Sequence, residues 1–217
     1  MNYSAVIVAA GRSTRFALDI PKILYEFPDG RKVIDLTVRV FLDDEDCRQI
    51  IIVTNEAVKE YLEERYDDER IIICRGGESR QDSVYNGLKH VSEEYVLVHD
   101  GARCFLERED LENLKKEISE EQGALLVKSE TDTVKIAEDG YVVRTIDRDR
   151  VKRAQTPQGF SSKELKNCYE KALADGFVGT DDCSLVERYG TVRIKCVESA
   201  GANIKITTAK DVEGGIR

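Results

Sequence analysis

The sequence predicts an α/β fold in which a mostly parallel sheet carries helices on both faces and one β-hairpin arm protrudes. Two observations lead to this prediction. Along most of the 217 residues, short apolar runs alternate with segments of helical periodicity, which is typical of successive βαβ units. Residues 133–146 break that alternation and contain Asp139-Gly140, the strongest short-range hairpin signal. The length fits one large domain or one domain with an appendage, and it allows a sizeable core.

The first strand is expected over residues 5–10, a continuous apolar run that ends at Gly11 and suits burial on both faces of a parallel sheet. Small, hydroxyl and cationic residues fill the loop after it: Arg12, Ser13, Thr14, Arg15, Pro21 and Lys22. Such a loop can bring backbone N–H groups close to phosphate oxygens while its cations neutralise their charge. The loop is therefore predicted to cradle phosphate, the alternative being an ordinary turn with solvated arginines. Neither GxxxxGK[ST] nor GxGxxG occurs here, which argues against a Walker loop and a dinucleotide fingerprint.

The chain continues to alternate as far as the arm. Helices are expected over residues 33–41, 57–66, 81–91 and 111–118, and strands over residues 49–53, 71–74, 95–98 and 124–127. Helices of this length between strands imply parallel crossovers, and ligands bind beyond the carboxyl ends of strands in such sheets. The loops after residues 10, 74 and 98 are therefore expected to face one crevice.

The hairpin at residues 133–146 cannot be inserted into a parallel sheet without loss of pairing, so it is expected to project as an arm. Its apolar residues must be buried against another surface. We expect that surface to belong to a second copy of the chain; packing on its own domain is the alternative.

Beyond the arm, Ser161 and Glu164 suggest a capping box for a helix that runs to Ala174. Thr180-Asp181 can cap the next helix. That helix is expected over residues 183–188. Late strands are expected over residues 193–197 and 204–206, and a last helix could start after residue 208.

Composition limits the partners and the compartment. The net charge of −9 disfavours nucleic acid and anionic membranes as partners, so a nucleotide site must gather its cations locally. Six cysteines without a CxxC pair and only two histidines give no recognisable zinc spacing, and reduced thiols fit a cytoplasmic protein. A strand predicted almost at the first residue leaves no room for a signal peptide, and no apolar run approaches membrane-spanning length. We therefore expect a cytoplasmic protein.

Two further loops carry candidate chemistry. Residues 75–83 read RGGESRQDS, and paired glycines at a strand end let a planar base approach the backbone, although they also suit a tight turn. Residues 98–103 read VHDGAR and place Asp100 at a strand's carboxyl end. Because Mg²⁺ on a triphosphate is typically held by one or two carboxylates with phosphate oxygens and water, Asp100 is a candidate metal ligand; a turn cap is the alternative. His99 is expected to be structural.

Seven ordered motifs together resemble one family. AAGRSTRF followed by PK, GGESRQDSVYNGL, VHDGARCF, DTVK, RAQTPQGF, GTDDCSLVE and GANIKIT look like the 2-C-methyl-D-erythritol 4-phosphate cytidylyltransferases of the non-mevalonate isoprenoid pathway. The resemblance implies a Rossmann-like sheet, one nucleotidyltransferase domain over residues 1–217, and a homodimer joined through an arm at about residues 131–152. The chain departs from the family's usual pattern at Ser13, Ile23, Glu78 and Cys104, and residues 26–31 look longer than is typical.

The resemblance also implies roles for individual residues, with CTP and 2-C-methyl-D-erythritol 4-phosphate as substrates and Mg²⁺ as cofactor. The catalytic contacts to the triphosphate would come from Arg15 and Lys22. The cytidine would lie among Ala10, Gly11, Gly77, Glu78, Ser83, Gly101 and Ala102, with Asp100 near the metal. The polyol phosphate would be held by Arg103, Thr133, Arg148, Thr156, Thr180 and Lys205, with Arg148 coming from the partner's arm.

Two alternatives remain open from the sequence. A ribitol-5-phosphate cytidylyltransferase has closely similar motifs, although the alanine in HDGAR and the DDCSLVE stretch favour methylerythritol phosphate. A catalytically inactive nucleotide-binding dimer is the other alternative. The presence of both Arg15 and Lys22 argues against it, because binding alone would tolerate the loss of either.

Overall fold

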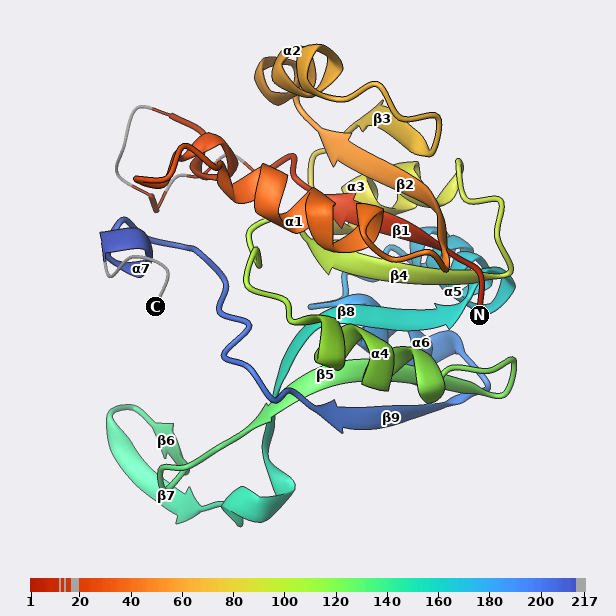
Figure 1. The fold of residues 1–217 in the computed structure, drawn as a ribbon. Coiled ribbons are helices and arrows are strands. Elements are labelled where there is room, and N and C mark those ends of the chain that lie inside the picture. Colours follow the sequence, from red (N-terminus) through yellow and green to blue (C-terminus); the bar gives the residue numbers. More distant parts are fainter. Residues whose placement is uncertain (12, 14, 17–19, 214–217) are drawn as a thin grey trace.

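A seven-stranded sheet forms the centre of the protein (Figure 1), described here from a computed structural model that covers residues 1–213 apart from 12, 14 and 17–19. Its strands, in chain order, are β1 (Tyr3–Val8), β2 (Cys47–Thr54), β3 (Ile71–Arg75), β4 (Tyr95–Asp100), β5 (Gln122–Ser129), β8 (Lys152–Ser161) and β9 (Arg193–Glu198). The spatial order is β3-β2-β1-β4-β8-β5-β9, and only β8 runs antiparallel to its neighbours. The predicted mostly parallel sheet is confirmed.

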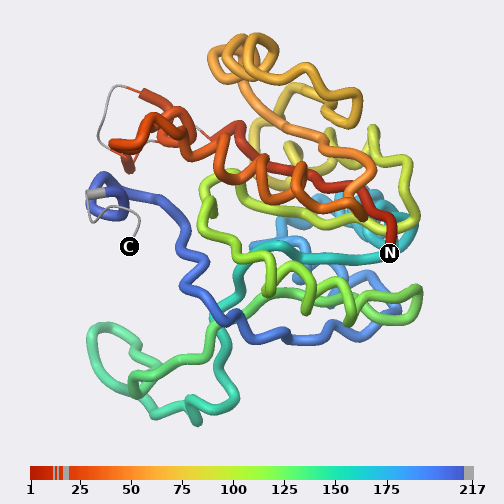
Figure 2. Tube along the Cα trace, in the orientation of Figure 1, coloured from red at the N-terminus to blue at the C-terminus, as the bar shows by residue number. Residues whose placement is uncertain are grey.

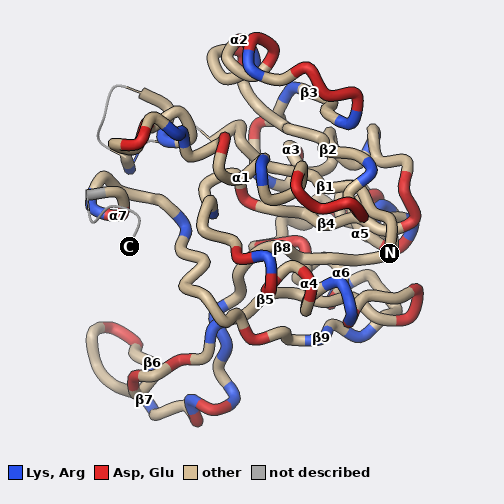
Figure 3. The backbone as a smooth tube through the Cα atoms, in the orientation of Figure 1, with Lys and Arg blue, Asp and Glu red and all other residues tan. Residues whose placement is uncertain are grey.

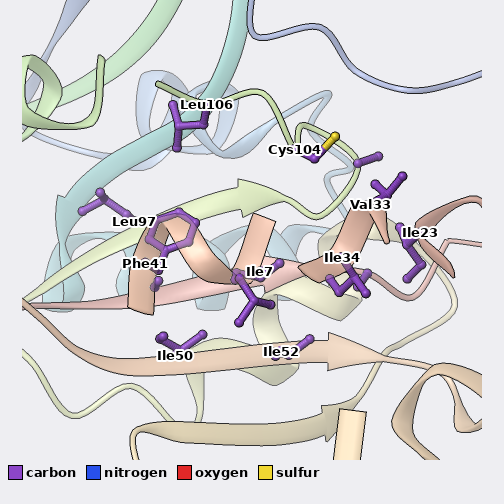
Figure 4. Packing of buried hydrophobic residues seen from close by; sticks show 14 of the residues in the cluster. Ile7, Ile23, Val33, Ile34, Phe41, Ile50, Ile52, Leu97, Cys104 and Leu106 are labelled. Carbon is purple, nitrogen blue, oxygen red and sulfur yellow. The ribbon is translucent and has the colours of Figure 1, made fainter. Parts of the chain in front are cut away.

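Helices cover both faces of the sheet, as the alternating sequence predicts. One face carries α1 (Val33–Leu42), α2 (Glu56–Arg65) and α4 (Arg108–Lys116), whose apolar side chains join a core cluster with β1 and β2. The other carries α3 (Arg80–Leu88), α5 (Ser162–Asp175) and α6 (Asp182–Tyr189) over a second cluster. Figure 4 shows the first cluster, where Phe41 and Ile34 of α1 lie against Ile7, Ile50 and Ile52 of the strands.

One strand was missed, and two local predictions are wrong. Strand β8 was not expected, because its buried stretch from Gln155 to Phe160 is largely polar or small. Residues 204–206 form no strand: Ile206 is buried, but its N–H donates to the Ala102 carbonyl outside any ladder. Ser161 precedes α5 without a capping bond from its side chain, since Glu164 instead accepts the Thr191 N–H. The cap of α6 by Asp181 is confirmed by its bond from the Ser184 N–H at 2.9 Å.

The hairpin arm is present where the sequence places it. Strands β6 (Lys135–Glu138) and β7 (Tyr141–Thr145) pair antiparallel around Asp139 and Gly140, whose φ angles of 50° and 85° fit a tight turn with two left-handed residues. Figure 1 shows the arm projecting from the main sheet, and Figure 3 shows basic and acidic residues alternating in the short helix η2 (Arg148–Arg150) after it. Tyr141 and Val142 are 79% and 64% exposed, so the arm leaves apolar surface open.

The C-terminal segment returns to the carboxyl edge of the sheet. After β9 it runs without regular structure to α7 (Lys210–Glu213), and Figure 2 shows it, in blue, approaching the red N-terminal loop. This path brings Lys205 and Thr207 to the cleft that Lys22 also lines. Among the residues that the structure describes, no helix has the length and apolar character needed to cross a bilayer.

At the opposite, amino edge of the sheet a buried ion pair ties three elements together. The Lys115 ammonium of α4 contacts Asp44 at 2.8 Å and Asp46 at 2.8 Å. Asp44, which follows α1, also accepts the hydroxyl of Tyr3 at 2.8 Å. A buried tyrosine, carboxylate and cation therefore join β1, α1 and α4 far from the carboxyl edge.

Candidate active site

A cleft of about 320 Å³ opens at the carboxyl ends of β1 and β4 and the start of α3. The three loops after β1, β3 and β4 all contribute to it, as predicted. Ten predicted site residues line it: Ala10, Gly11, Arg15, Lys22, Gly77, Glu78, Ser83, Asp100, Ala102 and Lys205. Two catalytic candidates, the metal candidate and most of the predicted nucleotide contacts therefore share one cavity.

The first loop presents two cations to this cleft. Arg15 is exposed, and Lys22 opens the short helix η1 (Lys22–Leu24). Burial lowers the pKa of Lys22, and the nearby charges of Lys205 and Arg15 act in the same direction, because each cation disfavours another beside it. The neighbouring cations therefore favour an anion in this part of the cleft. Arg12 and Thr14 of this loop lie outside the described residues.

Ser13 gives this loop its shape. Its φ of 53° lies in the left-handed region, which is uncommon for a residue with a β-carbon. Its hydroxyl oxygen accepts the Lys22 N–H at 3.1 Å and so links the two ends of the loop. The serine therefore adopts the backbone conformation that glycine adopts easily, and contributes a hydrogen bond that glycine would lack.

The loop after β3 leads directly into α3. Ser79 caps the helix by accepting the Asp82 N–H at 3.0 Å, and Asp82 accepts the Ser79 N–H in return at 3.0 Å. Ser83 accepts the Gly77 N–H at 3.0 Å. A β-carbon at Gly77 would overlap the side chain of Asp82, so the chain needs a glycine here. The turn brings backbone groups to the wall of the cleft, where a planar base can approach them.

Asp100 is the central anion of the cleft. One of its oxygens accepts Arg80 Nε at 3.1 Å and the other accepts Lys205 Nζ at 2.7 Å. Burial alone would raise the pKa of this carboxyl, but the charges of Arg80, Lys205 and Arg103 outweigh it and hold the pKa far below its usual range. Asp100 is therefore ionised at neutral pH.

His99 and Thr156 support the Asp100 turn from the interior. Thr156 Oγ1 accepts the Asp100 N–H at 3.0 Å and lies 3.1 Å from His99 Nδ1, while His99 Nε2 lies 3.1 Å from the Arg103 carbonyl. A carbonyl can only accept, so the neutral ring carries its proton on Nε2 and the Thr156 hydroxyl donates to Nδ1. Burial lowers the pKa of His99 to about 4, which keeps the ring neutral. His99 has the structural environment expected of it.

Six predicted site residues do not line the cleft: Gly101, Arg103, Thr133, Arg148, Thr156 and Thr180. Arg103 lies behind it, with Nε 3.8 Å from Asp100 and a bond from Nη1 to the Asn203 carbonyl. Thr156 is 4% exposed and already bonded. Thr133 and Arg148 are exposed on the arm, and Arg148 bonds the Thr131 carbonyl within it. The cleft of one chain therefore gathers the predicted nucleotide side more completely than the polyol side.

Arg80 also lines the cleft, and sequence reasoning did not single it out. Its position three residues after the Gly76-Gly77 pair was the available signal, since that loop was expected at the crevice.

The mostly parallel sheet and its carboxyl-edge cleft, in which backbone turns of small residues face Arg15, Lys22 and Lys205, fit a nucleotidyltransferase. The particular family follows from comparison with known proteins. The family model of 2-C-methyl-D-erythritol 4-phosphate cytidylyltransferase matches residues 3–214, and the chain belongs to this family.

Curated relatives and solved structures agree with this family. The chain is 40% identical over 215 residues to the 2-C-methyl-D-erythritol 4-phosphate cytidylyltransferase of Bacillus mycoides (strain KBAB4), covering 97% of this chain and 94% of that protein. The Francisella tularensis enzyme of the same name has a crystal structure that superposes with a TM-score of 0.81 at 32% identity, covering 99% and 98% of the two chains. The 4-diphosphocytidyl-2C-methyl-D-erythritol synthase of Anaerococcus prevotii DSM 20548 gives a TM-score of 0.84 at 34% identity, over 97% and 92%.

Proposed function

We propose that this protein is a cytidylyltransferase that transfers CMP from CTP to 2-C-methyl-D-erythritol 4-phosphate, giving 4-diphosphocytidyl-2-C-methyl-D-erythritol and pyrophosphate. The observation that carries the proposal is the cleft in which Arg15, Lys22 and Lys205 converge around Asp100 beside the small-residue loops. Membership of the family supports the choice of polyol, and it disfavours ribitol 5-phosphate and a catalytically inactive dimer.

The chemistry suits these side chains. A phosphate monoester oxygen of the polyol attacks the α-phosphorus of CTP, a new P–O bond forms there, and the bond to pyrophosphate breaks. Because a phosphate monoester with a second pKa of about 6 is largely ionised at neutral pH, the nucleophile needs no general base. The protein must instead hold two repelling anions in line and stabilise the charge on the leaving group. In this proposal Arg15 and Lys22 contact the triphosphate, and Lys205 contacts the polyol phosphate.

The cytidine is proposed to occupy the wall formed by the turn after β3 and the first loop. Ala10, Gly11 and Gly77 expose backbone there, and Ser83 and Glu78 add side-chain polar groups. Gly101 and Ala102 are proposed beside it. The Gly101 N–H donates to the Val8 carbonyl at 2.9 Å, so this turn is fixed against the end of β1.

Asp100 fits the role of a magnesium ligand in its donor chemistry. The carboxylate accepts one hydrogen bond on each oxygen, from Arg80 and Lys205, and a carboxylate has about four lone-pair sites, so acceptor capacity remains. Among the described residues no group of three or more metal-ligating side chains occurs, so the other ligands would be phosphate oxygens and water, as is usual for this ion. When bound, Mg²⁺ would supply charge stabilisation to the phosphates.

The remaining polyol contacts imply a dimer. We propose that the arm at about residues 131–152 crosses to a second copy and brings Arg148 and Thr133 beside the partner's cleft, and that Arg103, Thr156 and Thr180, which do not line the cleft of a single chain, complete the polyol side there. The exposed apolar side chains of β7 support this exchange. We further propose one nucleotidyltransferase domain over residues 1–217 and a cytoplasmic location, which the six free thiols support.

The test is pyrophosphate release by the purified protein with MgCl₂ and CTP. 2-C-methyl-D-erythritol 4-phosphate and ribitol 5-phosphate are compared as acceptors, and ATP, GTP and UTP replace CTP as controls. Release is expected with CTP and methylerythritol phosphate only. Faster release with ribitol 5-phosphate would select the other cytidylyltransferase, and no release with either acceptor would support the inactive dimer.

A further inference from the structure

A chain of charged groups connects the interior between α3, α5 and α6 with the cleft. The Tyr169 hydroxyl of α5 donates to Asp182 Oδ1 at 2.5 Å, and Arg80 donates from Nη2 to Asp182 Oδ2 at 2.8 Å. The same guanidinium donates from Nε to Asp100 Oδ1 at 3.1 Å. One arginine therefore bridges a carboxylate in the interior and the carboxylate in the cleft.

The interior end of this chain is firmly fixed. Asp182 and Tyr169 are 0% and 1% exposed. Tyr169 stacks on Tyr85 of α3 with ring centroids 6.2 Å apart and planes at 8°. Asp182 is the first residue of α6 and Arg80 is the first residue of α3, where Ser79 caps the helix. Arg80 is therefore held at its backbone by the cap and at its tip by Asp182.

At the cleft end of this chain of groups, the two oxygens of Asp100 have different partners. Oδ1 accepts Arg80 Nε, and Oδ2 accepts Lys205 Nζ at 2.7 Å. Arg103 Nε lies 3.8 Å from Oδ2 of Asp100. Without the bond from Arg80, Asp100 would be left with two cations on one side, and its carboxylate would be free to rotate toward them. Lys205, proposed to hold the polyol phosphate, would then be held more closely by Asp100.

We propose that Arg80 is a positioning residue for the transfer reaction: Asp182 and Tyr169 orient its guanidinium, and the guanidinium holds Asp100 and thereby Lys205 in their working orientation. This inference rests on the function proposed above.

Direct neutralisation of phosphate is the competing role for Arg80, since it lines the cleft. Two carboxylates already share its single positive charge, which leaves little to offer an incoming anion. A lysine could still contact phosphate as a point charge, but its ammonium lacks the planar fork that joins two carboxylates in fixed geometry. Arg80→Lys and Asp182→Asn therefore separate the two roles.

The experiment is a double-mutant cycle with both substrates and MgCl₂. We expect R80K to lower kcat about a hundredfold, the loss typical of disturbed electrostatic preorganisation. We expect D182N, which keeps an acceptor for Arg80 but loses the charge, to lower kcat about tenfold. The double variant R80K/D182N should be no slower than R80K, because Asp182 acts through Arg80. The KM for CTP, and the calorimetric Kd for CTP without acceptor, should stay within about twofold.

The matched control is Asp44→Asn. Tyr3, Asp44 and Lys115 form the same arrangement of tyrosine, carboxylate and cation at the amino edge of the sheet. D44N is expected to lower the melting temperature about as much as D182N while kcat stays normal. Equal losses of kcat in D44N and D182N would show a general structural effect and overturn the proposal.

Other outcomes also decide it. A kcat for D182N within twofold of the wild type, or multiplicative losses in the double variant, would overturn the positioning role. If R80K does not fold, the double variant Arg80→Gln/Asp182→Asn replaces it, because it removes both charges together. This double variant should fold and should have a low kcat. A normal kcat in it would contradict the inference. A wild-type protein that transfers no CMP refutes the proposed function, whereas an active wild type with fully active variants refutes this inference alone.

Discussion

Replacing Lys22 with methionine separates catalysis from stability more clearly than any other single change in the cleft. The substitution keeps the length of the side chain but removes a charge that lies near Arg15, Lys205 and Asp100. Losing one preorganised contact to the developing charge costs about 3 kcal/mol, or roughly a hundredfold in rate. We therefore expect kcat for CMP transfer to fall about a hundredfold.

The same change should not destabilise the free protein. The pKa of Lys22 is lowered in the folded state by burial and by Lys205 and Arg15, so the ammonium is disfavoured there relative to the unfolded chain. This cost is present at every pH below the ordinary lysine pKa and disappears when the charge is removed. The melting temperature of K22M without nucleotide should therefore equal or exceed that of the wild type.

The assay is steady-state pyrophosphate release together with a thermal melt of each variant. Lys166→Met is the matched control, because Lys166 donates to the Val91 carbonyl at 2.9 Å and does not line the cleft. A K22M enzyme with a kcat within fivefold of the wild type would refute the role of Lys22. A low kcat that merely accompanies a low melting temperature would refute the electrostatic reasoning.

Three further changes test other parts of the structure. Lys115→Met leaves the buried Asp44 without its cation and should cost about 3 kcal/mol in urea denaturation with kcat unchanged. The bond from Lys115 also lowers the pKa of Asp46, so the smaller contribution of Asp46 to stability is present above about pH 4 and is lost in more acid solution; the stability of K115M should therefore fall less steeply on acidification than that of the wild type. Val142→Asp puts a charge on the exposed apolar face of the arm and should convert a dimer to monomers in sedimentation velocity, with loss of activity; a monomeric wild type would contradict the exchange of arms. Ser13→Gly removes both an unusual φ and the bond to the Lys22 N–H, effects of about 1 kcal/mol each and opposite sign, so the melting temperature should change little, and a large fall would mean that the bond dominates.

The elements that the sequence predicts well are those with a periodic apolar pattern. Strand β2, helix α1 and the hairpin around Asp139-Gly140 all carry local signals that specify their conformation. Loops that follow parallel strands lie at the same edge of the sheet. For this reason Lys22 and Asp100 line one cleft although they lie far apart in the chain.

The elements that the sequence did not reveal depend on distant partners. In β8 the buried Gln158 is satisfied by Asp181 and by the Cys183 N–H, and Gln155 by Asn203, so the strand is polar yet central. Residues 204–206 alternate as a strand would, but the Ile206 N–H donates to the Ala102 carbonyl in a turn, so this pairing does not belong to a strand ladder. The link from Arg80 to Asp182 spans 102 positions and leaves no local pattern.

Phosphorus NMR of the complete reaction tests the central claim most directly. Purified protein, MgCl₂, CTP and 2-C-methyl-D-erythritol 4-phosphate are followed over time. If the cationic cleft joins the two anions, the monoester signal and the CTP signals should disappear in equal amounts, while the signals of a diphosphate diester and of pyrophosphate grow in equal amounts. Consumption of CTP with the monoester signal unchanged would mean hydrolysis rather than transfer, and would contradict the account.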